Sequence, residues 1–272
     1  MSVYFETNNE RAFGTFPLRG EAAHQAIQRA AKVGYSAFDT AQMYQNEADT
    51  GMALAATGIE REKLFITTKV HPDNFTENQF VSSVGQSLID LKTDYVDMLL
   101  LHWPPVGGDV DQPLLLLQDC LKRGLTKNIG VSNFNLRMLR RAVEVLDAPI
   151  GTNQVEFHAL LNQDALLKGA SALGVSLSSY CSIARGEVFK HPVLAEVGKR
   201  YQRSAAQVAL RWILQKGVSV NTMSTNPKNI SSNFEVMDFT LSNVDMSLVD
   251  RLTSTQFRIV TADIVKWAPE WD

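Results

Sequence analysis

The chain has 272 residues, of which 45% are hydrophobic and 20% are charged, and its formal net charge is −3. This composition is typical of a folded globular protein and argues against disorder. No basic run is interleaved with aromatic residues, so the sequence argues against a nucleic-acid partner and favours a small-molecule partner. The length fits two small domains or one α/β barrel, and the even composition favours a single domain over residues 1–272.

The cysteine content and the chain start favour a cytoplasmic protein. Cys120 and Cys181 are too few for a disulfide framework and form no C-x-x-C pair, as expected in a reducing compartment. The opening residues, MSVYFETNNERAFG, are acidic and polar, unlike a signal peptide. No apolar run approaches the roughly 20 residues of a membrane-spanning helix, so we expect no membrane partner.

Eight short apolar runs, each followed by a segment of helical period, predict eight strands. They cover residues 12–16, 36–39, 64–69, 95–102, 128–132, 151–156, 176–181 and 219–223. Several are continuous runs of Val, Leu, Ile and Met, which is typical of parallel strands covered by helices.

The intervening helices have recognisable ends. Residues 21–33 form an amphipathic segment that should stop at Gly34. Ser204 has the spacing of a capping box and opens a helix that Gly217 should close, and Thr76 has similar spacing at the start of another helix. This alternation predicts a single-domain (β/α)8 TIM barrel.

Active sites of this fold lie at the carboxyl ends of the strands, so the polar residues there are the candidates. Lys69 ends an apolar run and needs a counter-ion, for which Asp39 is the candidate. Tyr44 follows Asp39 closely enough to return over Lys69, whose charge should lower the phenol pKa from near 10 toward neutrality. Such a tyrosine can protonate a carbonyl oxygen, and His102 could orient the same oxygen, preferably as a neutral imidazole.

Five stretches, GYSAFDTAQMYQNEADTG, FITTKV, LLLHWP, IGVSNFN and NQVEFH, together resemble the aldo-keto reductases. The similarity runs from about Phe13 through the closing APEWD and is greatest to the bacterial 2,5-diketo-gluconate reductase group. The resemblance implies NADPH-dependent reduction of an aldehyde or ketone, with a small-molecule carbonyl substrate, by a monomeric barrel. The family holds its dinucleotide without a G-x-G-x-x-G motif, and this chain has none.

The resemblance also implies roles for individual residues. The catalytic set is Tyr44 as general acid, Lys69 and Asp39 as the groups that tune it, and His102 as the group that orients the carbonyl. The cofactor set is Thr15, Ser132, Asn133, Gln154, Tyr180, Cys181, Ser182, Ile183, Arg185, Met223, Ser224, Asn226, Asn229 and Asn233. The substrate set is Phe16, His71 and Trp103.

Two departures from the family pattern stand out. Met223 and Asn229 replace the lysine and arginine that usually clamp the 2′-phosphate, which should weaken the preference for NADPH, although Lys228 can compensate in part. NADPH remains the first expectation, with NADH or dual use open. His71 stands where relatives often have tryptophan, so the pocket should be smaller or more polar on that side. The short tail, residues 266–272, offers little material for a lid.

Two other functions compete with reduction. A lysine at a barrel strand end also serves Schiff-base aldolases, which would make Lys69 a nucleophile. The altered phosphate site would suit a nucleotide-binding sensor or interaction subunit without turnover, although all four candidate catalytic residues are present. His158 lies near Gln154 without a metal-binding pattern, so we expect no metal site.

Overall fold

The computed structural model describes residues 3–272, and in this part of the chain the expected (β/α)8 barrel is confirmed. Eight parallel strands pair in sequence order, and β8 closes the barrel on β1. The strands are β1 (Arg11–Gly14), β2 (Ala37–Asp39), β3 (Phe65–Val70), β4 (Met98–Leu101), β5 (Ile129–Ser132), β6 (Ile150–Glu156), β7 (Leu177–Tyr180) and β8 (Ser219–Thr222).

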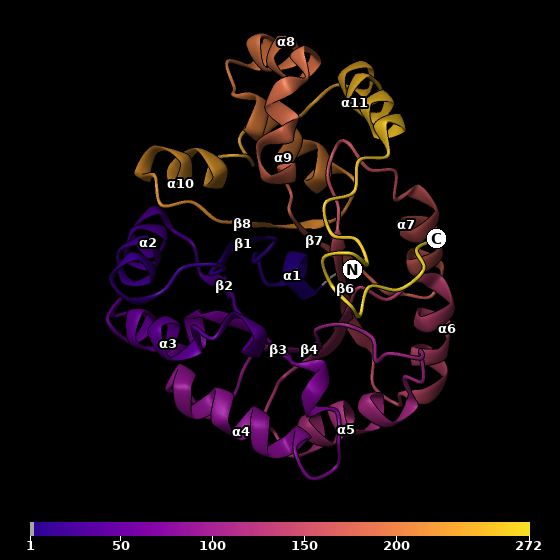
Figure 1. Cartoon of the computed structure of the whole chain (residues 1–272). Helices are drawn as coiled ribbons and strands as arrows, with labels where there is room; N and C mark the ends of the chain where they lie inside the picture. Colours follow the sequence, from indigo (N-terminus) through magenta and orange to yellow (C-terminus); the bar gives the residue numbers. More distant parts are fainter. Residues whose placement is uncertain (1–2) are drawn as a thin grey trace.

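Helices form a ring around the strands (Figure 1). The α-helices are α1 (Val3–Glu6), α2 (Gly20–Val33), α3 (Glu47–Ala55), α4 (Phe80–Leu91), α5 (Asp111–Lys122), α6 (Leu136–Val145), α7 (Asp164–Ala172), α8 (Pro192–Tyr201), α9 (Ala205–Gln215), α10 (Pro227–Phe234) and α11 (Asn243–Asp250). Short 3-10 helices are η1 (Gln42–Tyr44), η2 (Arg61–Lys63), η3 (Pro72–Asn74), η4 (Ala184–Lys190) and η5 (Arg251–Thr255). Within residues 3–272, none of the helices has both the length and the apolar character to span a membrane.

Helix ends follow local hydrogen bonding. Gly34 ends α2 in the left-handed conformation, and Ser204 and Gln207 form the predicted capping box at α9. The predicted start at Thr76 is wrong, because α4 begins at Phe80. The Thr76 hydroxyl donates to the side chain of Gln79 at 3.0 Å instead of accepting its backbone N–H, so no capping box forms.

The strand predicted at residues 95–102 is shorter in the structure, where β4 begins at Met98. Asp97, just before it, accepts hydrogen bonds from Arg61 at 2.8 Å and from the backbone N–H of Ile66 at 3.0 Å. Residues 98–101 are all buried and form the apolar run itself. The predicted strand is therefore confirmed for residues 98–101, whereas residues 95–97 and 102 lie outside it.

The amino-terminal end of the barrel is filled by side chains. Tyr4 of α1 is buried there, its ring lies 4.9 Å from that of Phe65, and its hydroxyl is 3.1 Å from Oγ1 of Thr67. Tyr4 belongs to a small apolar cluster with Ala12, Ala37, Phe65, Met98 and Leu100. This plug leaves the carboxyl ends of the strands as the open face for a site.

The contact between α3 and α4 depends on Gly51. A Cβ atom there would lie 2.2 Å from the backbone oxygen of Asp90. We therefore expect Gly51→Ala to lower the free energy of unfolding by about 2–3 kcal/mol, as overpacking does. Gly85→Ala is the matched control on α4, because a Cβ there meets nothing within 4 Å, and it should raise stability by about 0.5–1 kcal/mol. Urea denaturation followed by circular dichroism measures both, and an unchanged Gly51→Ala would contradict this helix contact.

Candidate active site

Lys69 is the centre of a buried cluster at the open end of the barrel. Its side chain has no solvent exposure, and Nζ donates to Oδ1 of Asp39 at 2.5 Å and to the carbonyl oxygen of Thr40 at 2.9 Å. The third contact is to the hydroxyl of Tyr44 at 3.2 Å. The three donors of the ammonium group are thus all used.

The charge state of Lys69 follows from these partners. Burial lowers the pKa of Lys69, but the charge of Asp39 and the contact with Tyr44 outweigh it, and the pKa is raised above its usual value. The amine is therefore a charged ammonium at neutral pH.

Asp39 is held from both sides. Its Oδ1 faces Lys69, while Oδ2 accepts a hydrogen bond from Nε2 of Gln154 at 2.8 Å. Gln154 lies on β6 and Asp39 on β2, so this contact joins strands that are not neighbours in the barrel. The carboxylate is fixed in one orientation, with one oxygen committed to the lysine.

Tyr44 reaches Lys69 because η1 follows β2 and turns the chain back toward the barrel. Burial raises the pKa of Tyr44, and the opposing charge of Lys69 does not cancel that effect. The expectation that the ammonium lowers this pKa toward neutrality is therefore wrong, because desolvation of a phenolate outweighs the nearby charge. The consequence is a phenol that keeps its proton at neutral pH.

His102, directly beyond β4, completes the catalytic candidates. Its ring lies 5.4 Å from that of Tyr44 at an interplanar angle of 81°. Burial, assisted by the charges of Lys69 and His71, lowers the pKa of His102 well below 6.5, so the imidazole is neutral as the sequence predicted. Tyr44 and His102 are thus two uncharged hydrogen-bonding groups at the same mouth, on the same side as the ammonium.

The amides expected to bind a nicotinamide form one network at the ends of β5, β6 and β7. Nδ2 of Asn133 donates to the carbonyl oxygen of His102 and to Oγ of Ser132, each at 3.0 Å. The hydroxyl of Tyr180 donates to Oδ1 of Asn133 at 2.8 Å, and Oγ of Ser132 donates to the carbonyl oxygen of Gln154 at 2.7 Å. The structure therefore brings these four residues together with the catalytic candidates.

The loop after β7 turns sharply next to this network. Cys181 and Arg185 both have positive φ, at 51° and 50°. Oγ of Ser182 donates to the carbonyl oxygen of Asn221 at 2.9 Å, which ties the loop to β8, and Ile183 packs against the core. Burial raises the pKa of Cys181 to about 11, so the thiol is not a nucleophile at neutral pH.

Some buried polar atoms near these strand ends have no partner among residues 3–272. They are Oγ1 of Thr15, Oδ1 of Asn221 and Nδ1 of His102. Because buried polar groups are normally hydrogen-bonded, this set fits a face that receives a polar ligand.

The predicted phosphate-binding residues lie on the turn from β8 into α10. Met223 follows β8 and is 36% exposed. Asn226 caps α10 by accepting the N–H of Lys228 at 2.9 Å, and Oγ of Ser224 accepts the N–H of Asn226 at 3.1 Å. Asn229 is exposed in the first turn of α10, whereas Asn233 is buried one turn later.

The substrate side of the mouth is lined by aromatic rings. Phe16 is 52% exposed, and its ring lies 5.1 Å from that of Tyr44. Trp103 is buried, and its ring is stacked 6.4 Å from that of His102. The ring of His71 lies 5.2 Å from Trp267, which the sequence analysis did not select.

Trp267 belongs to residues 256–272, which we call the C-terminal strap. This segment crosses the same end of the barrel (yellow in Figure 1). Within the short tail, residues 266–272, Trp267 packs against His71. The contact depends on the fold, which returns the chain end across the mouth. The two tryptophans in the last seven residues, KWAPEWD, were a signal that this segment packs against the protein.

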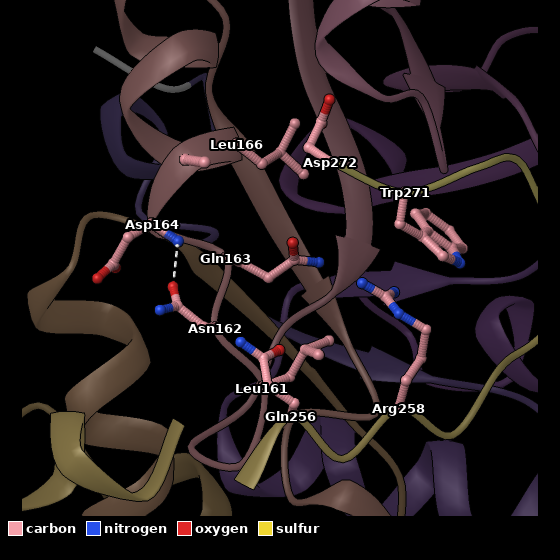
Figure 2. Close-up of a pocket in the computed structure, with 10 residues that line it drawn as sticks. Leu161, Asn162, Gln163, Asp164, Leu166, Gln256, Arg258, Trp271 and Asp272 are labelled. Carbon is pink, nitrogen blue, oxygen red and sulfur yellow. Dashed lines mark hydrogen bonds between the residues drawn. The ribbon is translucent and has the colours of Figure 1, made fainter. Parts of the chain in front are cut away.

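A polar cavity of about 430 Å³ lies between the strap and the β6–α7 loop. It is lined by Leu161, Asn162, Gln163, Asp164, Ala165, Leu166, Gln256, Arg258, Trp271 and Asp272. Figure 2 shows Arg258 and Trp271 on one side and the loop residues on the other. None of the candidate catalytic residues lines this cavity, which separates the strap from the outer part of the barrel.

Comparison with known proteins finds one family and several relatives of similar length. Residues 12–254 match the model of the aldo/keto reductase family. The chain is 35% identical over 262 residues to "Methylglyoxal reductase DkgB" of Escherichia coli O157:H7, covering 95% of this chain and 97% of that protein. It is 39% identical over 243 residues to "Aldo-keto reductase Rv2971" of Mycobacterium tuberculosis, covering 88% and 85%.

A solved structure is also closely similar. A provisionally named 2,5-diketo-D-gluconic acid reductase B superposes with a TM-score of 0.94 at 40% identity, covering 100% of this chain and 97% of that one. An aldose reductase from Schistosoma japonicum superposes with a TM-score of 0.89 at 27% identity, covering 94% and 92%.

The buried ion pair makes a stability prediction. Asp39→Asn leaves the ammonium of Lys69 buried without its counter-ion, and we expect a loss of about 3–5 kcal/mol in unfolding free energy. The double variant Asp39→Asn, Lys69→Met removes both charges and should recover much of that loss. Thermal and urea denaturation of the parent protein, the two single variants Asp39→Asn and Lys69→Met, and the double variant measure this coupling. Additive effects of the two substitutions would contradict a direct pairing.

Proposed function

We propose that this chain, which belongs to the aldo/keto reductase family, reduces an aldehyde or ketone to an alcohol with Tyr44 as the proton donor. The oxidoreductase class follows from the family and its reductase relatives. The observation that carries the proposed proton transfer is the 3.2 Å contact between the hydroxyl of Tyr44 and the ammonium of Lys69, next to the neutral ring of His102.

The reaction needs a hydride and a proton. A reduced nicotinamide, when bound, supplies the hydride to the carbonyl carbon. The carbonyl oxygen then gains negative charge, which the phenol of Tyr44 and the imidazole of His102 can stabilise by donating hydrogen bonds. Tyr44 passes its proton to that oxygen as the alcohol forms.

Lys69 and Asp39 support this transfer electrostatically. After Tyr44 releases its proton, the adjacent ammonium stabilises the phenolate, because Nζ already contacts the hydroxyl oxygen. Asp39 keeps the ammonium in place and charged. The same charge disfavours Schiff-base chemistry, which requires a neutral amine at Lys69.

The residues that would hold the nicotinamide are those of the amide network. Gln154, Asn133 and Ser132 would bind its carboxamide, and the ring of Tyr180 would lie against it. Gln154 would then touch both the cofactor and Asp39, because its Nε2 already bonds that carboxylate. Binding of the cofactor and placement of the proton donor would share one side chain.

The proposed cofactor is NADPH, with NADH also accepted. Met223 and Asn229 provide no positive charge for a 2′-phosphate, which weakens the usual discrimination. Lys228 lies in the first turn of α10 and is exposed, so it is a cation available to that phosphate.

The proposed substrate is a small, polar carbonyl compound. The mouth is narrowed by Trp267 against His71 and by Phe16 against Tyr44. A relative carries the name methylglyoxal reductase, and a structural neighbour is named for a sugar-derived diketo acid. Both names describe oxygenated carbonyl compounds, which are consistent with a mouth that carries the polar imidazole of His71.

Tyr44→Phe tests the proton donor. We expect kcat for methylglyoxal to fall by about a thousandfold, because proton transfer to the developing alkoxide is lost. The affinity for NADPH, measured by quenching of tryptophan fluorescence, should change little. The matched control is Tyr95→Phe near the opposite end of the barrel, which should keep the full rate. A Tyr44→Phe enzyme with most of its activity would remove Tyr44 from this role.

Lys228→Ala tests the cofactor assignment. Loss of one charge-assisted phosphate contact should raise KM for NADPH about tenfold and leave KM for NADH unchanged. Met223→Lys supplies a cation, so it should lower KM for NADPH relative to KM for NADH. Lys63→Ala, an exposed lysine on η2, is the control. Equal effects on both cofactors would show that Lys228 does not contact the 2′-phosphate.

A further inference from the structure

Glu156 is a buried carboxylate that the proposed reaction does not use. It is the last residue of β6, and both it and His158 have no solvent exposure. Nε2 of His158 lies 2.9 Å from Oε1 of Glu156. Because Nδ1 of His158 accepts the backbone N–H of Leu160 at 3.3 Å, the ring proton belongs on Nε2 and is donated to Glu156.

The other hydrogen bonds to Glu156 come from the C-terminal strap. The backbone N–H of Ile259 donates to Oε1 at 2.6 Å, and that of Val260 donates to Oε2 at 2.9 Å. These donors lie 103 and 104 positions further along the chain. Through these two hydrogen bonds, Glu156 ties the strap to β6.

The route of the strap makes this tie important. Ile264, Val265 and Ala268 form backbone hydrogen bonds within the strap itself. Arg258 and Trp271 both line the polar cavity (Figure 2), and the guanidinium of Arg258 lies 4.1 Å from the ring centroid of Trp271. Near Trp267 the strap meets the barrel through the ring of His71 and through Nζ of Lys266, which lies 4.0 Å from Oδ1 of Asp73 at the exposed surface. The hydrogen bonds that hold the strap to the barrel lie at its two ends.

The two ends are held differently. The far end is held where Nδ2 of Asn135 donates to the carbonyl oxygen of Glu270 at 2.9 Å and where Asp272 accepts the N–H of Leu136 at 2.9 Å. The near end is held by Glu156 and by the N–H of Phe257, which donates to the carbonyl oxygen of Leu160 at 2.8 Å. At the near end, Glu156 is fully buried and accepts two backbone N–H groups of the strap.

We propose that Glu156, supported by His158, is a positioning residue that fixes the strap and so sets the substrate wall formed by Trp267 against His71. This inference rests on the proposed function, because it assigns one wall of the same site. For a carbonyl compound too small to reach this wall, kcat/KM should not depend on the hydrogen bonds of Glu156 to the strap. For a bulky carbonyl compound, kcat/KM should depend on these hydrogen bonds.

Glu156→Gln tests the proposal because it keeps the size of the side chain and replaces one acceptor oxygen with a donor. With NADPH, we expect kcat/KM for a bulky aromatic aldehyde to fall about tenfold, since small misplacements of a binding wall have effects of this order or larger. The value for methylglyoxal should change less than about twofold, and NADPH affinity should stay the same. Glu60→Gln, at an exposed position on η2, is the matched control.

Limited proteolysis provides a measurement that needs no turnover. In Glu156→Gln, cleavage within residues 256–272 should be faster than in the parent protein, as identified by mass spectrometry. Trp267→Ala should reproduce the size-dependent loss without faster cleavage near Ile259. If Glu156→Gln does not fold, Glu156→Asp keeps the buried charge with a shorter reach and should show the same pattern at smaller amplitude.

Equal loss with both aldehydes, or an unchanged cleavage rate, would overturn the positioning role. Faster cleavage in a protein whose parent form reduces no carbonyl compound would instead refute the proposed function and leave the tie itself supported. The two failures are therefore distinguishable.

Discussion

The site depends on one ammonium group that is removed from water. Burying the charge of Lys69 is costly, and the cost is offset only while Asp39, Thr40 and Tyr44 all receive its hydrogen bonds. Each of these partners lies on β2 or on the turn that follows it. The requirement to satisfy one cation therefore fixes the β2–η1 segment against β3 and places the phenol at the barrel mouth.

Strand β6 organises the opposite half of the mouth through alternate residues. Gln154 and Glu156 are two positions apart, so their side chains leave the strand on the same side. The first bonds Asp39, and the second bonds the C-terminal strap. One strand thus connects the cluster around Lys69 with the C-terminal strap, and a shift of β6 would disturb both.

The sequence was most informative where a polar or charged side chain stands at the end of a run of residues that should be buried. Asp39, Lys69 and His102 are polar residues at the ends of apolar runs, and that conflict predicted both the barrel mouth and the ion pair. Other features depend on contacts between distant segments. The hydrogen bond between Gln154 and Asp39 spans 115 positions, and those from the strap to Glu156 span more than 100. No local sequence pattern predicts them. The start of α4 was missed because Thr76 had the spacing of a capping box but bonds the side chain of Gln79.

The direction of the Tyr44 pKa shift could not be predicted from the sequence, because two electrostatic effects oppose each other there. A nearby ammonium favours phenolate, whereas exclusion of water disfavours it, and only the degree of burial decides the result. In this site burial prevails, so the resting phenol carries its proton beside an uncharged imidazole. Both groups are then in the form that donates to a carbonyl oxygen. Burial thus sets the protonation state that the proposed reduction requires, whereas oxidation of an alcohol by the same groups would first need the less stable phenolate.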